Sequence, residues 1–107
     1  MADVAEFGRQ ADLIEAELRG LGAWQAEPPP QEVIDNGGAF GMNTMAFTQW
    51  LQFVLVPRLR AVAAGTAAVP PGSQVGAHAV REFDGWYEAA GLNQLLIGLD
   101  DLVARSR

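Results

Sequence analysis

The segment that decides the fold is residues 44–64, which read TMAFTQWLQFVLVPRLRAVAA. The run from Trp50 to Val56 is apolar except for Gln52, and a run this short is compatible with either a buried strand or a buried helix. The length of the whole segment favours the helix, because apolar residues continue past this run until Gly65. A helix that is apolar on nearly every side is typical of the centre of a domain, so we predict that it is buried.

This central helix has a predicted start and a predicted interruption. Asn43 or Thr44 is expected to cap its amino end, because both side chains accept hydrogen bonds from the first free backbone N–H groups of a helix. Pro57 lacks the N–H that would bond to the carbonyl of Phe53. The helix is therefore predicted to kink or divide at the proline.

The residues before the central helix are predicted to form one helix and one long loop. Residues 3–21 place apolar side chains three and four positions apart, which is one face of an amphipathic helix, with Asp3 as its cap. Residues 23–43 contain three consecutive prolines, which exclude regular helix and favour an extended form. So long a connection in a small domain is typically functional or disordered, and its Trp and Phe side chains favour packing against the helices.

Two more helices are predicted after the central one. Ser73 is expected to cap a third helix over about residues 74–90, which Gly76 should weaken by about 1 kcal/mol relative to alanine. A leucine-rich fourth helix is expected over residues 92–104, with Asp100 facing outward. No convincing strand pattern is present, so the prediction is an all-α four-helix bundle with a long Pro-rich loop between the first helix and the buried central helix.

Composition limits the class of protein. The chain has 107 residues and no cysteine, which fits a single domain, 1–107, with a core that needs no disulfide. Its net charge is −6 at pH 7, so we expect it to repel nucleic acid and anionic membrane surfaces. No signal peptide is visible and no apolar run approaches the length of about 20 residues that a membrane span needs. A cytoplasmic location is therefore the expectation.

Residues 40–45, FGMNTM, and residues 49–58, QWLQFVLVPR, resemble the YqcC-like family of small bacterial proteins. The resemblance extends through the Pro-rich stretch and the leucine-rich last segment, and so covers nearly the whole chain. It implies a small helical bundle of unestablished biochemical role, with no catalytic residue to carry over. Because some members are encoded beside a tRNA pseudouridine synthase, it also implies a link to that enzyme. Asn43 departs from the family pattern, which has Asp there, but both residues cap helices well.

Two polar side chains of the central helix have open interpretations. The guanidinium of Arg58 could clamp an anionic ligand. Alternatively it binds no ligand, and either pairs with Asp12, Glu82 or Asp84 or extends to water. Gln52 either lines a polar cleft or satisfies backbone groups of the loop that lies against the bundle. We favour the internal role for both residues.

The aromatic and proline residues also have two interpretations. Trp24, Trp50 and Trp86 either form a ligand pocket or belong to the core, and the core is favoured for Trp50 and Trp86. The prolines around Pro29 form either a stiff spacer or a polyproline ligand for an aromatic groove on a partner, and Phe40 lies on the same loop. His78 is expected to be a solvated helix residue, because a metal site around it would have to be completed by carboxylates alone.

No Ser-His-Asp set, phosphate-binding glycine loop or converging carboxylate pair is visible in the sequence, so it predicts a protein that is not an enzyme and holds no cofactor or metal. The first hypothesis is a module that binds an unidentified protein, or a second copy of itself, through the loop with Trp24, Pro29 and Phe40, beside Arg58. The second is a site for an anionic small molecule at Pro57, with Arg58 supplying charge and Gln52 or Trp50 supplying shape. The third, from the resemblance alone, is an accessory factor of a tRNA pseudouridine synthase.

Overall fold

The computed structural model describes residues 3–106, which contain helices and loops and no strand. Two short 3₁₀ turns and one π-helical turn accompany six α-helices within this range. The α-helices are α1 (Ala5–Gly20), α2 (Gln31–Asp35), α3 (Phe47–Trp50), α4 (Val56–Ala63), α5 (Val75–Glu82) and α6 (Ala90–Arg105). The 3₁₀ turns are Ala39–Gly41 and Tyr87–Ala89, and the π-helical turn is Leu51–Leu55. The predicted all-α class is confirmed.

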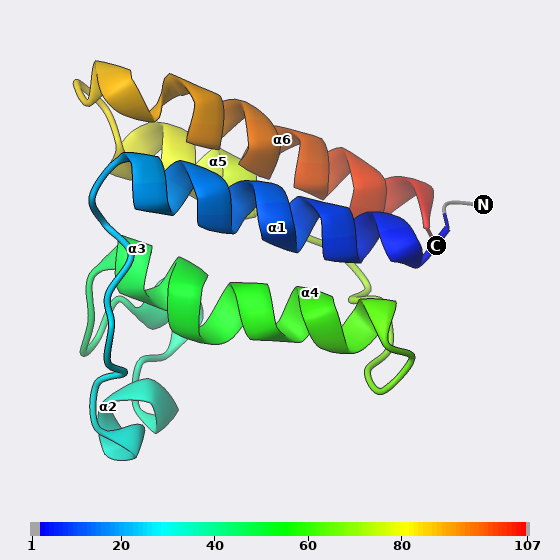
Figure 1. The fold of residues 1–107 in the computed structure, drawn as a ribbon, viewed down its shortest axis with the longest axis horizontal. Helices are drawn as coiled ribbons and strands as arrows, with labels where there is room; N and C mark the ends of the chain where they lie inside the picture. The colour runs from blue at the N-terminus through cyan, green and yellow to red at the C-terminus, as the bar shows by residue number, and fades with distance from the viewer. Residues whose placement is uncertain (1–2, 107) are drawn as a thin grey trace.

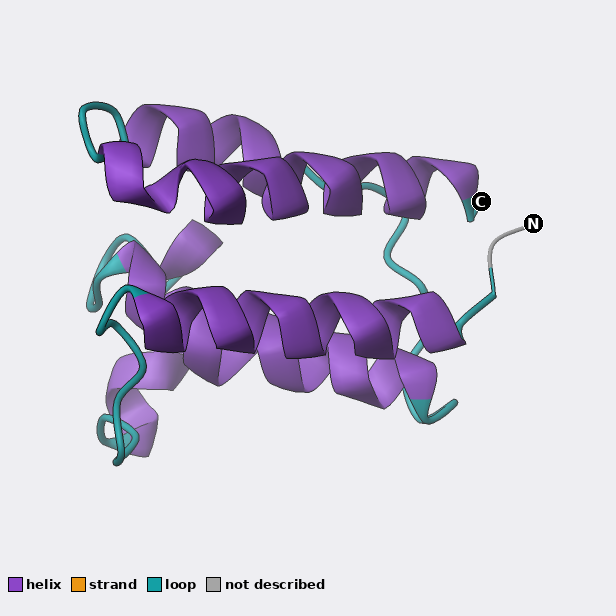
Figure 2. Ribbon diagram, turned by 45° about the horizontal axis from the view of Figure 1, so that its top comes forward, coloured by secondary structure: helices purple, strands orange, loops and turns teal. Residues whose placement is uncertain are grey.

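Four helical elements form the bundle. α1 packs against both α4 and α6, and α5 packs along α6. Figure 1 shows α1, α4 and α6 running side by side, with α2 and its flanking loops at the end of the bundle where α3 begins. Turned by 45°, the bundle shows two helix pairs, α1 with α4 and α5 with α6 (Figure 2). The predicted four-helix bundle, with a long connection between the first helix and the central one, is therefore confirmed.

The core consists of the apolar faces that the sequence periodicity predicted. In α1, the side chains three and four positions apart are fully buried, whereas Val4 at the edge of the same stripe is 45% exposed. The largest fully buried side chains are Phe7, Ile14, Leu18, Leu51, Val56, Val62, Leu92, Leu96, Leu99, Leu102 and Val103. They come from α1, the central helical segment and α6, so these three elements carry most of the apolar burial that stabilises the fold.

The central helix begins at Phe47, three residues later than predicted. The side-chain oxygen of Gln49 accepts a hydrogen bond from the Ala46 N–H at 2.9 Å, so a side chain from inside the first turn satisfies the backbone at the helix start. The prediction that Asn43 or Thr44 caps this helix was therefore wrong. The Thr44 hydroxyl instead donates to the Val33 carbonyl at 2.5 Å, which ties the loop to α2.

The helical backbone continues through Pro57 and is not divided there, because a π-helical turn just before the proline accommodates the missing N–H. The Val56 N–H donates to the carbonyl of Leu51, five residues earlier, in place of the usual partner four residues earlier. Pro57 then occupies the first turn of α4, where a missing N–H is tolerated. The chain thus continues as one rod from Phe47 to Ala63 (Figure 1).

The third predicted helix is shorter than expected. α5 ends at Glu82, and Gly85 adopts a φ of 83° in the turn that follows, a conformation that glycine adopts without steric cost. α6 then begins at Ala90. The pattern of apolar residues continued past Glu82 because the turn itself packs into the core, with Phe83 buried.

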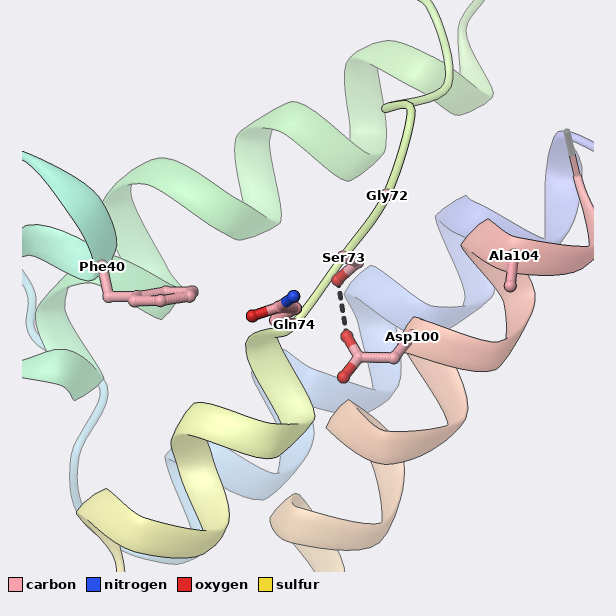
Figure 3. Close-up of a pocket in the computed structure, with 6 residues that line it drawn as sticks. All are labelled: Phe40, Gly72, Ser73, Gln74, Asp100 and Ala104. Atoms are coloured by element: carbon pink, nitrogen blue, oxygen red, sulfur yellow. Dashed lines mark hydrogen bonds between the residues drawn. The ribbon is translucent and has the colours of Figure 1, made fainter.

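Asp100 does not face outward, contrary to the prediction. Its two carboxylate oxygens accept hydrogen bonds from the Val75 N–H at 3.0 Å and the Gly76 N–H at 2.9 Å. The Ser73 hydroxyl donates to the same carboxylate at 2.5 Å (Figure 3). A side chain of α6 therefore caps α5, and Ser73, the predicted cap, orients that side chain.

Candidate functional site

The loop of residues 37–45 holds Phe40 in an uncommon backbone conformation. Phe40 has a φ of 55°, between Gly38 at 68° and Gly41 at 71°, and the left-handed region is sterically costly for a residue with a bulky side chain. Two backbone hydrogen bonds close the loop around it, from Asn43 N–H to the Gly37 carbonyl and from Met45 N–H to the Gly41 carbonyl, both at 2.9 Å. The loop is thus built to point one aromatic ring in a fixed direction.

That ring belongs to an aromatic cluster at the end of the bundle. Phe40 stacks on the His78 imidazole, with the ring centroids 4.3 Å apart and an interplanar angle of 12°. It meets Trp50 edge to face at 5.4 Å and Phe47 at 6.1 Å. These contacts stabilise the strained loop, since aromatic pairs in such arrangements contribute about 0.5–1.5 kcal/mol each beyond the area that they bury.

His78 is buried, so the prediction of a solvated helix residue was wrong. Its residue surface is 9% exposed, because Phe40 covers one ring face and the edge of Phe47 lies against it. Within residues 3–106 its Nε2 atom has no hydrogen-bond partner, and a carboxylate oxygen of Glu82 lies 3.7 Å away. A lone histidine gives no sequence signal for such burial, because its partner Phe40 is 38 positions away in the chain.

A groove lies on both sides of Phe40. Three cavities of about 570, 220 and 430 Å³ share Phe40 in their walls. The residues that line at least two of these cavities, which we call the Phe40 groove, are Phe40, Trp50, Arg58, Gly72, Ser73 and Gln74. Figure 3 shows the Phe40 ring and the Gln74 side chain facing each other across the opening, with Asp100 and Ser73 beyond them.

Arg58 lines two of these cavities and is exposed. It makes no ion pair and donates no side-chain hydrogen bond within residues 3–106. The predicted pairing with Asp12, Glu82 or Asp84 was therefore wrong, whereas the other favoured outcome, a side chain that reaches water, fits the exposure of Arg58. Arg60 binds Asp12 instead, at 3.4 Å, and Glu15 at 2.7 Å. Each residue turns a helix by about 100°, so two arginines two positions apart face different sides.

Arg60 and its carboxylate partners join α1 to α4 at the surface. Hydrogen bonds from Arg60 and from Arg19 hold the pKa of the Glu15 carboxyl below its usual value. The contribution of this surface network to stability is therefore present at neutral pH and is lost as the pH falls through the lowered pKa of Glu15. Since Arg60 is committed here, Arg58 is the arginine of α4 that is left for a ligand or a partner.

Trp24, Pro29 and Gln52 do not line the Phe40 groove. Gln52 is 5% exposed; its amide donates to the Gln25 carbonyl at 2.7 Å and accepts from the Gln25 N–H at 2.8 Å. The expectation that Gln52 satisfies loop backbone groups is confirmed. Trp24 is half-buried, with the Arg19 guanidinium 4.9 Å from its ring centroid, and belongs to the start of the loop.

Replacing Gln52 by alanine is expected to lower the free energy of unfolding by about 1 kcal/mol, because the Gln25 backbone then loses both partners. Urea denaturation measures the loss, and hydrogen exchange at the Gln25 N–H should accelerate. Gln94→Ala, at an exposed position of α6, is the matched control and should change stability by less than about 0.5 kcal/mol. Equal losses in the two variants would contradict the proposed anchoring role.

Three of the residues that form the groove, namely Phe40, Trp50 and Arg58, were among the binding residues predicted from the sequence. Sequence reasoning missed Ser73 and Gln74, which reach the groove from the loop before α5. The glycines on either side of Phe40 were the available signal for a left-handed turn. No local pattern indicates where Gln74 lies, because its position depends on the packing of α5 along α6.

Comparison with known proteins places the chain in a family. A family model described as tRNA pseudouridine synthase C matches residues 7–102. The chain belongs to this family, DUF446. An uncharacterised protein of Haemophilus influenzae is 28% identical over 94 residues, which are 85% of this chain and 86% of that protein. The predicted membership of a small bacterial family is thereby confirmed, whereas the name YqcC-like stays a prediction.

A second relative of this DUF446 protein is much longer. A tRNA pseudouridine synthase C of Pectobacterium carotovorum is 37% identical over 57 residues, which are 53% of this chain but 15% of that protein. The chain therefore matches a small part of that relative's length. No solved structure matches the chain. Over residues 3–106, no helix combines the length and the apolar character that crossing a membrane requires.

Proposed function

We propose that this DUF446 protein is a non-catalytic accessory module that binds a tRNA pseudouridine synthase C. One observation carries the proposal: a segment similar to 53% of this chain occurs within a protein named tRNA pseudouridine synthase C, where it makes up 15% of the length. The larger part of that protein lies outside the match. Two modules on one chain meet at high effective concentration, so a separate chain of the same kind would have to make the same contact through its own affinity.

The charge of the module favours a contact with the enzyme and not with its tRNA. The net charge is −6 at pH 7, and a phosphate backbone is bound through clustered cations that displace counterions. The polar side chains of the groove also suit binding better than catalysis, because the Ser73 hydroxyl is committed to Asp100. The proposed contact surface is the loop of residues 37–45 beside Arg58, where the apolar Met42 is 67% exposed.

The test is calorimetric titration of the full chain with the tRNA pseudouridine synthase C of the same organism, and separately with tRNA alone. We expect binding to the enzyme and none to tRNA. Met42→Glu should weaken enzyme binding by about tenfold, or about 1.4 kcal/mol. Leu13→Glu, at a 48% exposed position of α1 away from the loop, is the matched control and should leave the affinity unchanged.

Two results would overturn the proposal. The first is a dissociation constant for the enzyme weaker than about 1 mM, together with unchanged pseudouridine content in tRNA when the gene is deleted. The second is binding to tRNA alone with the affinity seen for the enzyme, which would assign the module to nucleic acid. Both variants replace exposed side chains, so far-UV circular dichroism should show that they fold.

A further inference from the structure

The smallest of the three cavities, about 220 Å³, has a chemical character unlike the rest of the protein. Its floor is made by apolar side chains of α4 and α6 and of the π-helical turn, namely Leu55, Leu59, Val62, Leu99 and Val103. No carboxylate lines it, although the chain has 13 acidic residues. Among the described residues, 3–106, Arg58 is the only charged residue that lines it.

Arg58 gives the mouth of this cavity a preference for a carboxylate ligand. A guanidinium has five N–H donors in a planar fork that matches a carboxylate with two parallel hydrogen bonds. The donors of Arg58 have no partner within residues 3–106, and Gln74 adds a side-chain amide to the same wall. A single cation beside apolar walls favours a monoanion, because a dianionic phosphate would keep one charge unpaired close to Asp100 in the adjoining cavity.

The size of the cavity limits the apolar part of the ligand. An apolar protein cavity of about 150 Å³ holds one benzene molecule. A cavity of about 220 Å³ therefore has room for a somewhat larger group, such as a phenyl ring with a short chain or a straight chain of about six to eight carbons. Burial of such a group against Leu and Val side chains supplies the affinity, and the guanidinium supplies the orientation.

We propose that this cavity is a binding site for a small monocarboxylate with an apolar body. The carboxylate pairs with Arg58 at the mouth, and the body lies between α4 and α6 under Phe40 and Trp50. The proposal does not depend on binding to the synthase, and its test uses the isolated chain. A failure here leaves the proposed accessory function standing, and the reverse also holds.

The experiment titrates the protein with octanoate and with 3-phenylpropanoate, followed by tryptophan fluorescence, to which Trp50 contributes beside Trp24 and Trp86, and by backbone amide chemical shifts. We expect saturable binding, with shifts concentrated at Val62, Leu99 and Gln74. The neutral amides of the two acids are the chemical controls, and each should bind at least about tenfold more weakly than its acid.

Matched arginine variants then separate a specific contact from general charge. Arg58→Gln should weaken octanoate binding by about tenfold or more, whereas Arg60→Gln, which removes the same charge two residues away, should change it by less than about twofold. Arg58 is exposed and has no ion-pair partner within residues 3–106, so its variant should fold, which thermal unfolding verifies. Equal binding of acid and amide, equal losses in the two variants, or absence of saturable binding would each overturn the proposal.

Discussion

Replacement of Gly76 by alanine is expected to lower the free energy of unfolding by about 1–3 kcal/mol, the usual cost of overpacking. A Cβ atom at Gly76 would lie 2.6 Å from both the Cα and the N of Ile97 and 2.8 Å from the carbonyl carbon of Leu96. These three atoms belong to the backbone of α6, so no side-chain rotation relieves the clash. α5 and α6 would have to move apart, and Val75 and Ala79 of α5 would lose packing.

Gly98→Ala is the matched control, because among residues 3–106 a Cβ built at that position of α6 meets no atom within 4 Å outside its chain neighbours and the nearby backbone of its own helix. Alanine should stabilise the helix there by about 0.5–1 kcal/mol. Urea denaturation of the two variants beside the parent chain measures both effects. The close approach of α5 to α6 would be contradicted if Gly76→Ala were as stable as the parent, since helix propensity alone predicts a gain at both positions.

Gly76 also shows where sequence reasoning about the fold ends. From the local sequence, Gly76 is predicted only to lower the stability of its helix relative to alanine, which holds for an isolated helix. That prediction leaves out the close contact between the backbones of α5 and α6, which only a residue without a side chain allows. The apolar stripe of α1 and the buried character of the central helix could be predicted, because each depends on a spacing within one segment. The central helix starts at Phe47 because of a side-chain hydrogen bond, and α5 ends at Glu82 because of a turn with a glycine at positive φ. The spacing of apolar residues predicts neither of these.

The same limit applies to the candidate site. Phe40, Trp50 and Arg58 belong to stretches that were recognisable in the sequence, and the fold brings all three to one groove. Trp24 and Gln52 were grouped with them, but Trp24 lies at the start of the loop, and the Gln52 side chain, in the π-helical turn, holds the Gln25 backbone there through two hydrogen bonds. The pairing of Asp12 with Arg60 in place of Arg58 depends on which side of α4 faces α1, and that orientation is a property of the packed bundle.

Asp100→Ala is expected to lower the free energy of unfolding by about 2–3 kcal/mol. One carboxylate accepts hydrogen bonds from Ser73, Val75 and Gly76, and hydrogen bonds to a charged group contribute about 1.5–3 kcal/mol. Val75 and Gly76 are buried, so the two N–H groups at the start of α5 would be left without a partner. The loop that carries Ser73 and Gln74 would lose its attachment to α6, so one wall of the Phe40 groove should loosen as well.

Asp101→Ala separates this capping role from a general charge effect. Asp101 is the exposed neighbour of Asp100 in α6, and its replacement should change stability by less than about 0.5 kcal/mol. Asp100→Asn retains one carbonyl acceptor and should lie between alanine and the parent. Urea denaturation ranks the three variants, and hydrogen exchange at the Val75 and Gly76 N–H groups should accelerate only where the cap is removed. If Asp100→Ala and Asp101→Ala were equally stable, α5 would not depend on a cap from α6, and the groove wall would need another support.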